Sequence, residues 1–142
     1  MIVLDTSVTM AWFFPDESSR YADTVLDYLR SARAIVPALW TFEVANVLLI
    51  GERRQRAIPA QSDQFLQLLA TLPLDVELRT FTDLMPTVLP LARQHTLSAY
   101  DAAYLDLALR LKVPLATLDR HLIEAAQTAG VPLFAPNKLG SA

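Results

Sequence analysis

The chain has 142 residues, of which 53% are hydrophobic, and its formal net charge is −3. That length fits one domain, which we expect to span residues 1–142, and the apolar content fits a sheet covered by helices on both faces. No apolar run approaches the roughly 18 to 20 residues of a membrane span. Asp5 also interrupts the apolar N-terminus, so we expect neither a membrane segment nor a signal peptide.

Cysteine and histidine, the usual ligands of zinc, are scarce: the chain has no cysteine and two histidines, His95 and His121. Disulfide frameworks and thiolate metal sites are therefore excluded, and we expect a cytoplasmic protein without a histidine-rich zinc site. The acidic balance argues against a non-specific nucleic-acid binder, whose affinity comes from basic contacts with phosphates. An acidic metal site is compatible with it, because the cation supplies the positive charge that meets a phosphate.

The first half of the chain alternates short apolar strands with amphipathic helices. We expect strands at residues 2–4 and 34–36, the second stopped by Pro37, and helices at about 17–31, at about 42–53 and from Pro59 onward. In the helix that Pro59 opens, the spacing predicts four residues facing inward: Phe65, Leu66, Leu68 and Leu69.

The second half continues the same alternation. We expect strands at residues 74–78, 115–117 and 131–134, and helices reaching 94, at 98–112 and at 119–127, with Gly130 closing the last one. Pro86 and Pro90 predict that the helix reaching residue 94 is kinked or broken, because proline removes a helical hydrogen bond.

This order of elements predicts an α/β fold, a three-layer α/β/α sandwich around a mostly parallel sheet of four to five strands. In such a sheet, the carboxyl ends of the strands and the N-termini of the helices share one edge, where ligands bind. Asp5 and Asp119 lie just past expected strand ends, and Glu43 and Asp101 lie in the first turn of expected helices. We therefore expect these four carboxylates to converge on one rim.

Each of these acids alone has an ordinary structural explanation, as a helix cap or as a favourable anion in a first helical turn. Together they are harder to explain in that way, above all Asp101, whose neighbours in the sequence are almost all small or apolar. Converging carboxylates repel one another unless a hard divalent cation joins them, and Mg²⁺ prefers such oxygen ligands. The pattern thus indicates metal-dependent hydrolysis of phosphodiesters.

Two other charged features are given structural interpretations. Asp106 lies about 140° around the helix from Asp101, so we expect it to point elsewhere. The basic run Arg53, Arg54 and Arg56 suits a solvated helix C-terminus, which we favour over a phosphate-contacting patch.

Four segments together resemble a known family: Asp5-Thr6-Ser7 after an apolar strand, Glu43 with Asn46 on a helix, residues 100–104 (Tyr-Asp-Ala-Ala-Tyr), and Thr117-Leu118-Asp119. In this order and spacing they resemble a PIN domain, and more narrowly a VapC-type toxin of a bacterial or archaeal toxin–antitoxin pair. The resemblance spans essentially the whole chain, and the segment around Asp101 is its most specific part.

The resemblance implies a small endoribonuclease that uses Mg²⁺ or Mn²⁺, forms a homodimer, cuts RNA and is silenced by a cognate VapB-type antitoxin. The family's acidic residues correspond here to Asp5, Glu43, Asp101 and Asp119, both as catalytic residues and as metal ligands. Its supporting positions correspond to Thr6, Ser7, Asn46 and Thr117. We expect Asp5 and Asp101 to bind the metal directly, and Glu43 and Asp119 to act directly or through water.

Other functions are weighed against this one. A phosphatase of the haloacid-dehalogenase type also begins with an aspartate after the first strand, but it needs a second aspartate where this chain has Ser7. A catalytically silent binding module is a further alternative, which the intact set of four acids disfavours. A nuclease of the same fold that processes RNA outside a toxin–antitoxin pair, or that cuts DNA, is the nearest alternative.

Overall fold

A parallel β-sheet forms the middle of the molecule. The structure is a computed structural model and describes residues 1–135. The strands are β1 (Ile2–Leu4), β2 (Ala34–Pro37), β3 (Leu74–Glu77) and β4 (Leu115–Ala116). They run in the order β3-β2-β1-β4, and all three neighbouring pairs are parallel. The predicted parallel sheet is therefore confirmed, with four strands.

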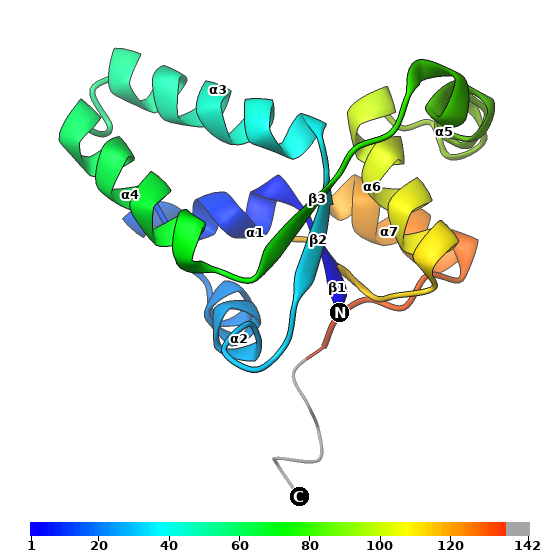
Figure 1. Cartoon of the computed structure of the whole chain (residues 1–142), viewed down its shortest axis with the longest axis horizontal. Helices are drawn as coiled ribbons and strands as arrows, with labels where there is room; N and C mark the ends of the chain where they lie inside the picture. Colours follow the sequence, from blue (N-terminus) through cyan, green and yellow to red (C-terminus); the bar gives the residue numbers. More distant parts are fainter. Residues whose placement is uncertain (136–142) are drawn as a thin grey trace, which may run out of the picture.

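Helices cover both faces of this sheet. They are α1 (Thr6–Ala11), α2 (Arg20–Tyr28), α3 (Leu39–Arg53), α4 (Pro59–Thr71), α5 (Phe81–His95), α6 (Ala99–Leu111) and α7 (Arg120–Ala129), with a short 3₁₀ helix, η1 (Pro15–Glu17). In Figure 1, α1, α3 and α4 lie on one side of the sheet, and α5, α6 and α7 lie on the other. The predicted three-layer α/β/α architecture is thus confirmed. Within residues 1–135, no helix is long and apolar enough to cross a membrane.

The core lies on both sides of β1, whose three residues Ile2, Val3 and Leu4 are at most 1% exposed. A strand with neighbours on both edges and helices on both faces has no solvated side, which is why its sequence is entirely apolar. Tyr104 on α6 and Phe14 are among the largest buried side chains of this core.

Several element boundaries differ from those expected. A helix, α1, begins directly after β1, where the sequence indicated only a cap at Asp5. The second helix begins at Arg20 rather than near residue 17, because the Ser19 side chain caps it. The fifth strand expected at 131–134 is reduced to a single bridge, between Leu133 and Leu115.

Pro37 ends β2 as predicted, whereas the two prolines of α5 do not end that helix. Pro37 is part of β2, at its end and opposite Glu77 of β3. Helix α5 runs without a break through Pro86 and Pro90, so the predicted break is wrong, and the alternative, a kink, stays a prediction. The two prolines are one turn apart and both exposed, so the helical hydrogen bonds that they remove lie on the solvent side, where water replaces them.

The inward face of α4 is narrower than predicted. Phe65 and Leu69 are buried, but Leu66 and Leu68 are 47% and 45% exposed, so their predicted inward placement is wrong. Phe65 and Leu69 lie one turn apart on a single stripe, and at about 100° per residue Leu66 and Leu68 fall on either side of it.

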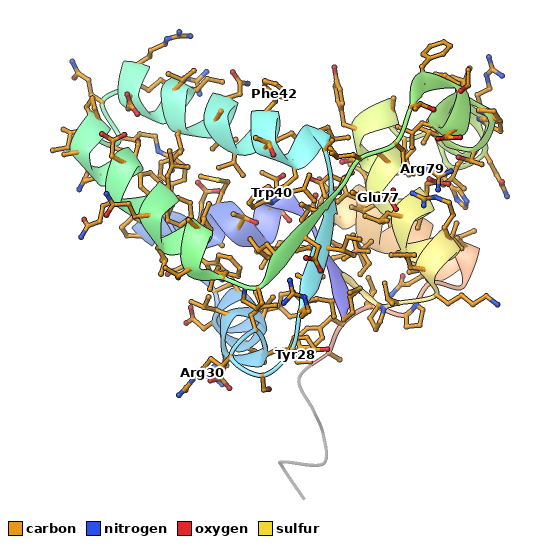
Figure 2. The ribbon with its side chains drawn as sticks, in the orientation of Figure 1. Tyr28, Arg30, Trp40, Phe42, Glu77 and Arg79 are labelled. Carbon is orange, nitrogen blue, oxygen red and sulfur yellow. The ribbon has the colours of Figure 1, made fainter. Side chains whose placement is uncertain are left out.

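Asp106 belongs to an ion-pair network on the far side of α6 from Asp101. Arg110 Nε donates to Asp106 Oδ2 at 2.8 Å, and its two terminal nitrogens donate to the Glu77 carboxylate at 3.0 and 2.6 Å. Asp106 is buried, and Glu77 reaches the network from the edge strand β3, beside α6 (Figure 2). The network ties α6 to that strand, which agrees with the structural role expected for Asp106.

We predict that Arg110→Met destabilises the fold by about 3–5 kcal/mol, because it leaves the buried Asp106 carboxylate without its cation. Urea unfolding measures the change. The control is Arg30→Met, whose ion pair with Asp27 is largely exposed, with an expected cost below about 1 kcal/mol. Equal losses in the two variants would contradict the structural role of the network.

Candidate active site

The four predicted acids lie at the carboxyl edge of the sheet, three of them at helix starts and Glu43 one turn into α3. Asp5 directly follows β1 and is the N-cap of α1, and Asp119 follows β4 and is the N-cap of α7. Asp101 lies in the first turn of α6, which Ser98 caps. Glu43 differs from its prediction: α3 already begins at Leu39, so Glu43 lies in the second turn.

The sheet topology brings these positions together. The chain moves outward from β1 to β2 and β3 and then returns to the other side of β1 with β4. A crevice forms at such a reversal, beyond the carboxyl ends of the two strands. Asp5 and Asp119 follow those strands, and the charges of Asp119, Asp5 and Glu43 all act on Asp101. We call Asp5, Glu43, Asp101 and Asp119 the carboxylate rim.

Asp5 is buried, and two hydroxyl groups hold one of its carboxylate oxygens. Oδ2 accepts from Ser7 Oγ at 2.6 Å and from Thr117 Oγ1 at 2.9 Å. Burial raises the pKa of Asp5, and these hydrogen bonds oppose the rise. Oδ1 has no hydrogen bond from residues 1–135, although every fully buried side-chain oxygen there has a partner. Oδ1 is therefore open to solvent and to a ligand.

The same two hydroxyls join the loops that carry Asp5 and Asp119. Ser7 Oγ accepts from the backbone N–H of Leu118 at 2.9 Å, and Thr117 Oγ1 accepts from the N–H of Asp119 at 3.0 Å. Ser7 and Thr117 thus fix the relative position of the two loops as well as the Asp5 carboxylate.

Glu43 is held by two hydroxyls from other helices. Its Oε1 accepts from Thr6 Oγ1 at 2.9 Å and from Tyr104 OH at 2.6 Å. Burial raises the pKa of Glu43, and these hydrogen bonds oppose the rise. Tyr104 is absent from the predicted site residues. Its position one turn after Asp101 on the same helix is the signal that would have pointed to it.

Asn46 lies one turn after Glu43 and lines a shallow groove with it. The groove is mainly apolar and is also lined by Leu39, Phe42, Ala45, Leu49 and Tyr100. Figure 2 shows Phe42 and Trp40 on opposite sides of α3, and Phe42 is 78% exposed whereas Trp40 is buried. The supporting role predicted for Asn46 stays a prediction.

The two histidines and the basic run have other surroundings. His95 and His121 line a separate groove between α5 and α7. Arg56 pairs with Asp16 and Glu17 and lies over the Phe14 ring at 3.9 Å. The basic run is at the end of α3, roughly 15 Å along the helix from Glu43.

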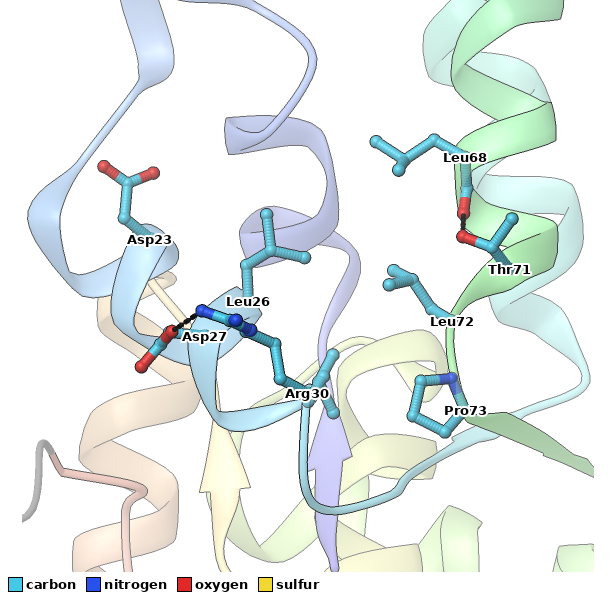
Figure 3. Close-up of a pocket in the computed structure, with 9 residues that line it drawn as sticks. Asp23, Leu26, Asp27, Arg30, Leu68, Thr71, Leu72 and Pro73 are labelled. Carbon is cyan, nitrogen blue, oxygen red and sulfur yellow. Dashed lines mark hydrogen bonds and ion pairs between the residues drawn. The ribbon is translucent and has the colours of Figure 1, made fainter.

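A further groove lies between α2 and α4 (Figure 3). Leu29 and Arg30 precede β2, and Leu72 and Pro73 precede β3, so this groove opens at the amino ends of the strands. It therefore does not extend the carboxylate rim, which lies at the other edge of the sheet.

The chemistry of the rim fits a hard cation. Among residues 1–135, no three histidine, cysteine, aspartate or glutamate side chains are arranged closely enough to hold a metal ion by themselves. Mg²⁺ in proteins commonly keeps several waters and binds through one or two carboxylates, so it does not require three. The rim offers oxygen donors only, with Asp5 Oδ1 open and the carboxylates electrostatically coupled. The assignment of all four acids as metal ligands stays a prediction.

Asp101 is the rim residue on whose pKa the charges of the other three acids all act. Burial, followed by the charges of Asp119, Asp5 and Glu43, raises the pKa of Asp101 from 3.8 to about 6. Between these values the folded chain holds a proton that the unfolded chain has released, so this group's contribution to stability falls as pH rises through the window. At pH 7, the ionised carboxylate therefore destabilises the metal-free fold.

We predict that Asp101→Asn stabilises the metal-free protein at pH 7 by about 1 kcal/mol, less than the full pKa shift would give because the group is half-exposed and screened by water. The gain should vanish near pH 4, where the wild-type carboxyl is largely protonated. Urea unfolding in EDTA at both pH values measures it, with the exposed Asp63→Asn as control. A variant less stable than wild type at pH 7 would contradict the repulsion.

Comparison with known proteins agrees with this geometry. The chain is 28% identical over 123 residues to Ribonuclease VapC3 of Pyrobaculum aerophilum, covering 87% of this chain and 92% of the relative. Its fold is similar to the crystal structure of PAE2754 from the same organism, with a TM-score of 0.65, 22% identity and coverage of 87% and 84%. It is also similar to a toxin–antitoxin complex from Klebsiella pneumoniae, with a TM-score of 0.63, 17% identity and coverage of 96% and 98%. The PIN domain model matches residues 2–127, and the chain belongs to the PIN domain family.

Proposed function

We propose that this chain is an endoribonuclease that hydrolyses RNA phosphodiester bonds at the carboxylate rim with a divalent cation, Mg²⁺ or Mn²⁺. The observation that carries the proposal is the hydrogen-bonded arrangement at the edge where β1 and β4 end: Ser7 and Thr117 join the loops of Asp5 and Asp119. Glu43 is held next to Thr6 by hydrogen bonds from Thr6 and Tyr104, and the charges of the other three acids act on Asp101. Membership of the PIN domain family and the similarity to a ribonuclease support the choice of reaction and substrate.

Asp5 and Asp101 are the proposed direct ligands of the cation, and Glu43 and Asp119 act directly or through water. The open Oδ1 of Asp5 and the raised pKa of Asp101 support this choice, because both groups lack a positive partner among the described residues. When bound, such a cation polarises a phosphoryl oxygen and lowers the pKa of a bound water.

The other residues of the proposed site position the carboxylates, accept a proton and contact the RNA. Ser7 and Thr117 hold Asp5 so that one oxygen stays open, and Thr6 helps to hold Glu43. Glu43 also has one oxygen without a described partner, which can accept a proton from the attacking water. Asn46 lines the groove beside Glu43, and its proposed role is to contact the RNA backbone.

We also propose that the protein is the toxin of a toxin–antitoxin pair, acts in the cytoplasm as a homodimer and is silenced by a cognate VapB-type antitoxin. The similarity of the fold to a solved toxin–antitoxin complex motivates the antitoxin. Exposed apolar side chains beside the rim favour self-association: Phe42 and Tyr100 are 78% and 64% exposed, and Leu49 lies next to them.

We predict that the purified chain cleaves RNA only with Mg²⁺ or Mn²⁺, and that Asp5→Asn lowers the single-turnover rate at least about 100-fold, since even partners of metal ligands cost 10–100-fold when lost. Asp63→Asn, an exposed acid on α4, is the matched control and should cleave at the wild-type rate. Cleavage in EDTA, or equal rates for all three proteins, would contradict the proposed function.

We predict that wild-type protein has the mass of a dimer in size-exclusion chromatography with light scattering, and that Phe42→Asp has the mass of a monomer. The added charge cannot be buried in an apolar contact without a large desolvation cost. Leu66→Asp, a similar change on an exposed residue of α4, should remain dimeric. A monomeric wild type, or an unchanged mass in Phe42→Asp, contradicts self-association through this face.

A further inference from the structure

Tyr104 carries a hydroxyl group inside the hydrophobic core. The residue is 0% exposed, and its hydroxyl lies 2.6 Å from Glu43 Oε1 and 2.8 Å from Thr6 Oγ1. A buried tyrosine hydroxyl needs a hydrogen-bond partner, whereas phenylalanine fills almost the same volume without that need. Glu43 and Thr6, the two residues that this hydroxyl contacts, belong to the candidate active site and come from α3 and α1.

The hydrogen bonds make the two oxygens of Glu43 unequal. Oε1 accepts from both Tyr104 and Thr6, which occupies its two lone pairs. Oε2 has no partner among residues 1–135 and is not fully buried, because every fully buried side-chain oxygen there has one. Two donors on one oxygen, held by different helices, fix the carboxylate in a single orientation. Without Tyr104, the 2.9 Å bond from Thr6 alone would leave the group free to rotate.

We propose that Tyr104 and Thr6 are a positioning pair that holds Glu43 with Oε2 toward the carboxylate rim, where it acts on the cation or on the attacking water. The inference rests on the proposed nuclease function and adds Tyr104 to its machinery. Neither residue touches the reacting atoms, because their hydroxyl hydrogens are directed to the inner oxygen of Glu43.

The placement of Tyr104 on α6 supports this role. Asp101 lies one turn earlier on the same helix. One rigid helix therefore carries both the Asp101 carboxylate and the hydroxyl that orients the Glu43 carboxylate. Residues 102–108 are buried, which fixes the helix against the sheet and leaves the hydroxyl little freedom. Hydrogen bonds of this kind to the ligands of a metal typically contribute 10–100-fold in affinity or activity.

The test compares Tyr104→Phe, Thr6→Val and Thr6→Ser with wild type. We expect Tyr104→Phe and Thr6→Val to weaken Mn²⁺ binding in calorimetry, or to lower kcat with KM unchanged, by about 10–100-fold. Thr6→Ser keeps the hydroxyl and should restore values near wild type. The matched control is Tyr28→Phe, which removes a tyrosine hydroxyl that accepts from the N-terminal amine at 3.2 Å, at the other edge of the sheet.

The possible outcomes separate this inference from the proposed function. If wild type binds Mn²⁺ and cleaves RNA while Tyr104→Phe and Thr6→Val match it, the pair only satisfies the core and the inference is overturned. If Tyr104→Phe does not fold, as circular dichroism would show, the contrast between Thr6→Val and Thr6→Ser decides in the same way. A folded wild type that neither binds Mn²⁺ nor cleaves RNA overturns the proposed function and the inference with it.

Discussion

Parallel pairing of β1 with β4 is the constraint on which the candidate site depends. It reverses the direction in which strands are added to the sheet, and it places the loop after β1 beside the loop after β4. Asp5 and Thr117 are therefore hydrogen-bonded although 112 positions separate them in the sequence. The apolar, fully buried β1 makes this pairing stable, since the strand would lose both its neighbours and its helical cover in any other position. Core and site are thus products of the same arrangement.

The arrangement has an electrostatic cost. Burial and the charges of the other three rim carboxylates raise the pKa of Asp101, and burial also raises the pKa values of Asp5 and Glu43. Hydroxyl groups lower this cost but supply no positive charge. Ser7 and Thr117 donate hydrogen bonds to one oxygen of Asp5, and Thr6 and Tyr104 donate to one oxygen of Glu43. In both acids the second oxygen is left for another ligand. Uncompensated charge of this kind favours a partner of opposite charge, and the divalent cation that we propose has the required charge and hardness.

Periodicity and helix-start signals were sufficient to predict the layers of the fold and the edge on which the acids lie, because both depend on local sequence. Asp5, Asp101 and Asp119 lie at helix starts, and the residues next to each of them in the sequence indicate those starts. Features that depend on distant residues were not accessible in this way: the start of α3 at Leu39, the contact between Tyr104 and Glu43, and the ion pairs of Arg110 with Glu77. The continuity of α5 was not predictable either. It depends on the exposure of Pro86 and Pro90, which the sequence does not reveal.

The carboxylate rim is proposed to hold a catalytic cation. Crystals of the wild-type protein grown or soaked with Mn²⁺, with diffraction recorded at an X-ray energy where manganese scatters anomalously, locate the ion directly. We expect an anomalous peak at the rim within bonding distance of Asp5 Oδ1 and of Asp101, and no peak there in Asp5→Asn crystals. A rim without manganese in wild-type crystals, with the ion bound instead in the groove of His95 and His121, would show that the rim does not hold the cation.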